Sequence, residues 1–189
     1  MRNIYAVFMS CFAAAVIAQD SEPALVEKPD TRIRMYVAGN GEYGVIKYTR
    51  TQNSPTRDVG GFSVAGGALI PLGSALDFRI EPEYTFVGRE DTQYNTFMLN
   101  MGLESNLRSS PVNFYGIVGG GINVLDTPFT YVDSGPAVNF GLGAVVRLSE
   151  GWKLDTGVRS TYSWIDYSEF NRETRIQTHL FHLGVRKVF

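Results

Sequence analysis

The stretch Leu76-Asp77-Phe78-Arg79-Ile80-Glu81-Pro82-Glu83-Tyr84-Thr85-Phe86 sorts its side chains by alternation. Apart from Pro82, the even-numbered positions are apolar or aromatic and the odd-numbered positions are charged or hydroxylated. A repeat of two residues places these two sets on opposite faces of an extended strand. Pro82 cannot donate a hydrogen bond to a neighbouring strand, so it is the weak point of the predicted pairing.

The same alternation of apolar and polar residues recurs along the rest of the chain. It marks further segments at about residues 33–37, 62–70, 97–103, 112–122, 138–148, 152–162 and 175–189. The sequence therefore predicts about eight strands, each near the length that crosses a bilayer when tilted. The predicted fold class is all-β, a transmembrane antiparallel up-and-down β-barrel.

The predicted connections alternate between short turns and longer loops. Residues 71–74, 105–110 and 149–151 form the short set, and residues 45–60, 87–93, 125–135 and 164–174 form the longer set. Short turns at one end and long loops at the other are typical of outer-membrane barrels. Because the number of strands is even, we expect both termini at the short-turn end, in the periplasm.

Alternation alone leaves two orientations open. A soluble, lipocalin-like barrel would turn its apolar face inward, whereas a membrane barrel turns it outward. The polar face mixes charged residues with many Gly, Ala and Ser. The interior of an eight-stranded barrel is narrow, so small residues must make room for long charged ones. This composition favours the membrane barrel, with the soluble barrel as the alternative.

The first residues are typical of an export signal. Residues 1–18 combine a positive start with an uncharged apolar run that ends in small residues, which predicts a signal peptide cleaved after Ala18. We interpret Cys11 as apolar filler rather than a lipidation site. Residues 19–31 are predicted as a polar periplasmic lead-in and residues 32–189 as the barrel.

Charge and composition exclude several kinds of partner. Lys and Arg number 17 against 19 Asp and Glu, a formal net charge of −2, so we expect no nucleic acid partner. One Cys and two His exclude a disulfide within the chain and a Cys- or His-rich metal centre. We therefore expect no cofactor and no metal.

Three segments and the C-terminus resemble a known family. ALDFRIEPEY at 75–84, FYGIVGGG at 114–121 and WKLDTGVR at 152–159 resemble small outer-membrane barrels of the outer-membrane protein A, opacity-protein and adhesion/invasion type. Gly184 and Phe189 resemble the C-terminal assembly signal of such proteins, with Lys187 departing from the pattern. The resemblance implies the outer membrane, contact with its lipid and lipopolysaccharide, the barrel assembly machinery, and a possible host or surface ligand at the loops.

We expect the polar faces of the strands to form a charged network in the lumen. An isolated buried charge is strongly penalised, so acids of the third strand should pair with bases of the sixth to eighth strands. This network is interpreted as a plug, with a narrow porin-like channel as the alternative. Its predicted members are Arg34, Asp77, Arg79, Glu81, Glu83, Asn100, Glu104, Arg147, Lys153, Asp155, Arg159 and Arg186.

A Ser–His pair on the lipid-facing wall is the one pattern that suggests an enzyme. Ser160 and His179 fall on neighbouring strands and could meet, with Asp166 or Glu169 as an orienting acid, in a lipid A-modifying site. The alternative is a polar pair near the lipid headgroups, and we expect no enzyme. The predicted role is structural or surface-interactive, through adhesion or evasion.

Overall fold

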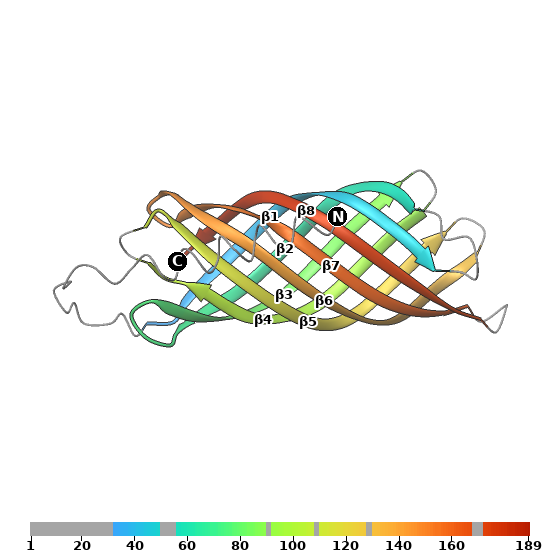
Figure 1. Ribbon diagram of the computed structural model, residues 1–189, viewed down its shortest axis with the longest axis horizontal. Helices are drawn as coiled ribbons and strands as arrows, with labels where there is room; N and C mark the ends of the chain where they lie inside the picture. Colours follow the sequence, from blue (N-terminus) through green and yellow to red (C-terminus); the bar gives the residue numbers. More distant parts are fainter. Residues whose placement is uncertain (1–31, 50–55, 90–91, 108–109, 128–129, 168–171) are drawn as a thin grey trace. The chain divides into compact units, whose positions relative to one another are not determined.

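The computed structural model describes residues 32–49, 56–89, 92–107, 110–127, 130–167 and 172–189 (Figure 1). The predicted signal peptide with Ala18 and the lead-in at 19–31 lie outside the described residues. Within the described ranges, no helix is long and apolar enough to cross a membrane.

Eight antiparallel strands close into one barrel in chain order, with β1 paired to β8. This confirms the predicted fold class. Figure 1 shows the strands wrapping obliquely around a common axis. The strands are β1 (Arg34–Thr49), β2 (Thr56–Pro71), β3 (Leu76–Arg89), β4 (Thr92–Ser105), β5 (Val112–Thr127), β6 (Thr130–Ser149), β7 (Trp152–Tyr167) and β8 (Arg172–Val188).

The stagger of the strands fixes the width of the barrel. Paired residues followed once around the barrel from Ala38 return to β1 at Tyr48, which is a displacement of 48 − 38 = 10 residues. Eight strands with this shear are strongly tilted and enclose an interior just wide enough for side chains. The side chains that point into the lumen therefore decide where it is closed.

The polar face of each strand points inward. Asp77, Arg79, Glu81 and Glu83 on β3 are buried, whereas apolar side chains such as Phe97, Leu99 and Phe181 are about half exposed on the outer wall. In water this arrangement would be unfavourable, but a bilayer solvates the apolar wall. The soluble-barrel alternative, with the apolar face inside, is therefore wrong.

The strands extend further than the sequence predicted. Most of residues 45–60, 87–93, 125–135 and 164–174, which we expected as loops, continue the ladders. Inward residues there such as Ile46 and Val59 are apolar and outward neighbours such as Lys47 and Asp58 are polar, so the polarity of the two faces is the reverse of the one that defined the strands. At this end of the barrel, which we call the loop end, residues 50–55, 90–91, 128–129 and 168–171 lie outside the described residues.

The opposite end, which we call the turn end, carries the short connections. Gly151 has a positive φ of 73° in the β6–β7 turn, and its carbonyl accepts a hydrogen bond from the N–H of Val188 at 2.7 Å. The N–H of Phe189 donates to the carbonyl of Met35 at 2.9 Å. The described pairing of β2 and β3 omits Pro82, as expected of a residue that has no N–H.

Candidate functional site

Two arginines lie between two tyrosine rings in the turn-end half of the lumen. The Arg79 Cζ atom is 4.3 Å from the centroid of Tyr115 and 5.4 Å from that of Tyr36. The Arg186 Cζ atom is 4.7 Å from the Tyr36 centroid and 5.7 Å from that of Tyr115. The negative faces of the rings stabilise both guanidinium groups, which allows two cations to share a small space.

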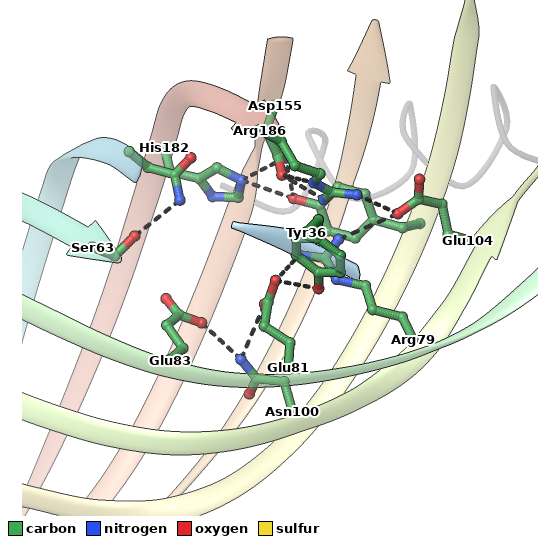
Figure 2. Close-up of polar contacts among 12 residues, drawn as sticks. Tyr36, Ser63, Arg79, Glu81, Glu83, Asn100, Glu104, Asp155, His182 and Arg186 are labelled. Atoms are coloured by element: carbon green, nitrogen blue, oxygen red, sulfur yellow. Dashed lines mark hydrogen bonds and ion pairs between the residues drawn. The ribbon is translucent and has the colours of Figure 1, made fainter. Parts of the chain in front are cut away.

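Three carboxylates neutralise these arginines (Figure 2). Arg186 donates from Nη1 to Glu104 Oε2 and from Nη2 to Asp155 Oδ2, each at 2.5 Å. Arg79 forms an ion pair with Glu81 and lies 3.6 Å from Glu104. All five side chains are at most 2 % exposed. Removing one partner would therefore leave an opposite charge buried without compensation.

Tyrosine hydroxyls and a histidine complete this cluster. Tyr36 Oη donates to Glu81 Oε2 at 2.7 Å, and Tyr115 Oη donates to Asp155 Oδ1 at 2.8 Å. His182 Nε2 lies 2.8 Å from Tyr115 Oη. We name as the charged layer the residues Tyr36, Arg79, Glu81, Glu104, Tyr115, Asp155 and Arg186.

The sequence did not single out the two tyrosines or His182. Both tyrosines lie on the face predicted to be polar, at positions that share the inward parity of their strands. Their odd or even position along the strand, which sets the face of the sheet, could therefore have identified them. They were left out because the predicted network included only charged residues and Asn100.

A second ion pair lies further toward the loop end. Arg159 on β7 pairs with Glu83 on β3, and Asn100 Nδ2 donates to Glu83 Oε2 at 2.7 Å. Ser63 Oγ donates to Glu42 Oε1 at 2.6 Å. The Glu83–Arg159 pair joins an acid of β3 to a base of a later strand, as expected. Arg79 instead pairs with Glu81, two residues away on its own strand.

Two of the basic residues at the turn end lie near acidic partners, and a third does not. Arg34 pairs with Asp77, and Lys153 lies 3.6 Å from Glu104. Arg147 was expected in the network, but its side chain is exposed and takes no part in the described ion pairs. Arg147 pairs with Lys153 at the last regular position of β6 before the register shift toward Ser149, so its side chain lies at the rim of the barrel and is exposed. The other predicted network residues are buried or half-buried.

Apolar side chains fill the lumen at the loop end. They form one buried cluster, which we call the apolar collar: Ile46, Val59, Val87, Tyr94, Leu125, Ile165, Ile176 and Leu180. Most of these residues were predicted as loops or assigned to no element. The cause is the reversed polarity of the two strand faces at this end.

Ser160 and His179 meet on the outer wall, as the sequence suggested they could. The two residues are direct partners on β7 and β8, and Ser160 Oγ lies 2.8 Å from His179 Nδ1. The Tyr162 ring stands edge-on to the His179 ring at 6.3 Å. The side chains of Asp166 and Glu169 lie outside the described residues. Within the described ranges, no three His, Cys, Asp or Glu side chains are grouped to hold a metal ion.

A closed barrel that buries its charges and exposes its apolar side chains is an outer-membrane β-barrel. Residues 4–189 match the model of the outer membrane protein beta-barrel domain, and the chain belongs to that family. No curated protein matches the chain.

Solved structures show the same fold. Neisserial surface protein A superposes with a TM-score of 0.54 at 17 % identity, covering 82 % of this chain and 97 % of that one. Ail, the attachment invasion locus protein of Yersinia pestis, also gives 0.54, at 13 % identity, covering 82 % of this chain and 98 % of that one. A second Ail structure, in complex with the heparin analogue sucrose octasulfate, gives 0.54 over 84 % of this chain. The chain is thus a protein of the cell outer membrane.

Proposed function

We propose that the protein is a non-conducting surface barrel that binds an extracellular ligand at its loop end. The observation that carries this proposal is the filled lumen. Arg79, Arg186 and their acidic partners are almost fully buried and joined by short contacts. A barrel with no open passage offers its exposed end rather than its interior to other molecules, and we place the loop end outside the cell.

The charged layer acts as the plug in this proposal. Separating Arg186 from Glu104 and Asp155 would leave uncompensated charges in a space with little water. We expect the purified barrel in a planar bilayer to conduct no more than the background. Steady single-channel currents from the wild-type protein would favour the porin-like alternative.

The proposed ligand is a polyanionic surface glycan. Three exposed cations lie on adjacent strands at the loop end, Arg175 on β8, Lys47 on β1 and Arg57 on β2. The pairs Thr49–Arg175 and Ile46–Arg57 place them within a few residues of one another across β1. The structurally similar Ail was solved with sucrose octasulfate, which supports a sulfated ligand class for this fold.

The test is retention on immobilised heparin. We expect a variant with Lys47→Gln, Arg57→Gln and Arg175→Gln to elute at lower salt than the wild type, because phosphate- and sulfate-type anions are held by Lys and Arg charge. A control variant removes two positive charges at the turn end, through Arg147→Gln and Lys187→Gln. Equal elution of the wild type and the triple variant would reject the glycan proposal.

We propose further that the Ser160–His179 contact is a polar pair of the outer wall and not a catalytic site. Both residues sit in paired strands, so nearby backbone N–H groups are engaged in the sheet, and acyl transfer needs free donors at the oxyanion. We expect the mass spectrum of lipid A to be the same in cells that express wild type or Ser160→Ala. Loss of an acyl chain with the wild type alone would establish the enzyme alternative.

The other proposed partners are those expected of any protein embedded in the outer membrane. We propose that the outer wall contacts lipid and lipopolysaccharide, and that Gly184 and Phe189 belong to a signal read by the barrel assembly machinery. Phe189 is 73 % exposed, which leaves its ring available for such an interaction. Gly184 is enclosed, because a Cβ there would overlap the side chain and backbone of Asn40.

A further inference from the structure

The interior of the barrel changes character in three steps along its axis. On β8, the inward side chains run from Ile176 at the loop end through Thr178, the collar residue Leu180 and His182 to Arg186. On β3 the same order is Val87, then Thr85 and Glu83, then Arg79. We call the middle region the polar layer: Asn40, Glu42, Ser63, Glu83, Thr85, Thr96, Asn100, Asn123, Asn139, Arg159, Thr161, Ser163, Thr178 and His182.

The polar layer holds more hydrogen-bonding atoms than the described protein satisfies. Both side-chain amide atoms of Asn139 are buried with no partner in the described chain. Outside this layer, Tyr94 Oη in the collar and Arg79 Nε, Arg79 Nη1 and Glu104 Oε1 in the charged layer also have no hydrogen-bond partner in the described chain. The other unpartnered atoms of the polar layer are Asn40 Oδ1, Glu42 Oε2, Asn100 Oδ1, Asn123 Oδ1, Arg159 Nε and His182 Nδ1. These residues are at most 9 % exposed, and three of the four asparagines are 0 % exposed.

Two of these amides face a glycine, which leaves space for their polar atoms. A Cβ on Gly119 would lie 2.7 Å from Asn139 Oδ1 and would overlap Asn100 Oδ1. A buried polar atom without a partner loses its hydrogen bonds to water and gains none in return. Interiors that keep such atoms hold ordered water, which makes two to four hydrogen bonds with the surrounding groups.

The apolar collar separates this layer from the loop end. Its Ile46, Ile165 and Ile176 side chains are 0 % exposed and pack with the other members in one cluster. A narrow apolar constriction excludes hydrated solutes because they would have to lose water without gaining hydrogen bonds. At its other side, the polar layer ends at the charged layer, whose residues fill the lumen.

We infer that the polar layer is a hydrated chamber, open to neither side at rest, and that the apolar collar is the gate through which a small hydrogen-bonding solute enters it from the loop end. The chamber is blind because the charged layer remains closed when the collar opens. This inference concerns the interior of the barrel and does not depend on the glycan ligand proposed above.

The experiment measures entry of a small polar reagent into the chamber. The chain beyond the predicted signal peptide contains no cysteine, so a single Thr161→Cys substitution introduces a unique thiol in the polar layer. The folded barrel in lipid vesicles is treated with 2-aminoethyl methanethiosulfonate, and the labelling rate is read by mass. Thr49→Cys, at an exposed position, gives the rate for free access.

We expect Thr161→Cys alone to label far more slowly than Thr49→Cys. Adding Ile46→Ser in the collar should raise the rate at least about tenfold, which corresponds to about 1.4 kcal/mol in opening free energy. Val45→Ser, the adjacent outer-wall substitution, is the matched control and should leave the rate unchanged. A boiled and unboiled gel shift checks that each variant is folded, and Ile176→Ser replaces Ile46→Ser where folding fails.

Three results would overturn the inference. Equal rates for Thr161→Cys and Thr49→Cys would show that the collar does not seal the chamber. Equal acceleration by Ile46→Ser and Val45→Ser would assign the effect to general loosening. Acceleration by Arg186→Met but not by either collar variant would make the charged layer the gate.

Discussion

The ring of Tyr115 lies over Gly143, its direct partner on the neighbouring strand, in the space that a side chain at residue 143 would occupy. Tyr36 and Gly67 stand in the same relation on β1 and β2. These two rings flank the paired arginines of the charged layer. The glycines therefore belong to the lumen cluster, although they contribute no polar side chain to it.

We expect Gly143→Ala to destabilise the barrel by about 1–3 kcal/mol, because the added methyl group would displace the Tyr115 ring and press on the carbonyl of Thr156. The measurement is urea unfolding of the barrel in lipid vesicles. Gly120→Ala is the control, since nothing lies within 4 Å of its Cβ position. Its stability should equal or slightly exceed that of the wild type. Equal stability of both variants would contradict the packing argument.

The effect of Arg186→Met should be larger. The substitution preserves the aliphatic volume but leaves Glu104 and Asp155 without their shortest ion-pair contacts, and breaking a buried pair costs about 3–5 kcal/mol. Lys187→Met on the outer wall is the matched control. Its ammonium lies 5.2 Å from the Trp152 ring centroid, an interaction of about 1 kcal/mol or less. Similar losses for the two variants would mean that the charged layer does not hold the barrel together.

The two-residue repeat of residues 76–86, together with its recurrence along the chain, was enough to predict the fold. It defined a polar face, and the geometry of a narrow barrel then required that face to point inward. The same reasoning predicted that Glu83 and Arg159 both point into the lumen, where they form an ion pair. Exact partners could not be predicted, because they depend on the register between strands, and a shift of two residues preserves the pattern while exchanging every neighbour.

The collar shows where this reasoning fails. Ile46 and Ile176 point inward like the charged residues, but they are apolar. The outward residues beside them, Lys47, Arg175 and Gln177, are polar, so the alternation is reversed there and no longer matches a polar inner face. The predicted strands therefore ended too early, and most collar residues were predicted as loops, although Ile176 and Leu180 fell within the predicted strand at 175–189. The prediction for Arg147 failed for a different reason: the residue has inward parity, but it lies at the rim of the barrel, where its side chain is exposed.

A double-mutant cycle on Glu83 and Arg159 should reveal strong coupling. Each single substitution, Glu83→Gln or Arg159→Met, leaves the other group buried without its ion-pair partner. The double variant removes both charges, so its loss of stability should be smaller than the sum of the two single losses by about 0.5–3 kcal/mol. A parallel cycle of Glu83→Gln with Lys187→Met should be additive to within about 0.5 kcal/mol. Additivity in the first cycle would show that Asn100, and not Arg159, satisfies Glu83.

Phe189→Ala should reduce assembly in cells while leaving the folded barrel nearly as stable as the wild type. The Phe189 side chain is 73 % exposed, and the only described hydrogen bond of this residue runs from its backbone N–H to Met35, which alanine keeps. Assembly is measured as the heat-modifiable fraction in washed outer membranes, and stability as urea unfolding of the purified barrel. Phe181→Ala, which truncates another ring of the outer wall, is the control and should assemble at the wild-type level. If Phe181→Ala lowers assembly as much as Phe189→Ala, the loss reflects apolar area in general and the C-terminal residue has no special part in it.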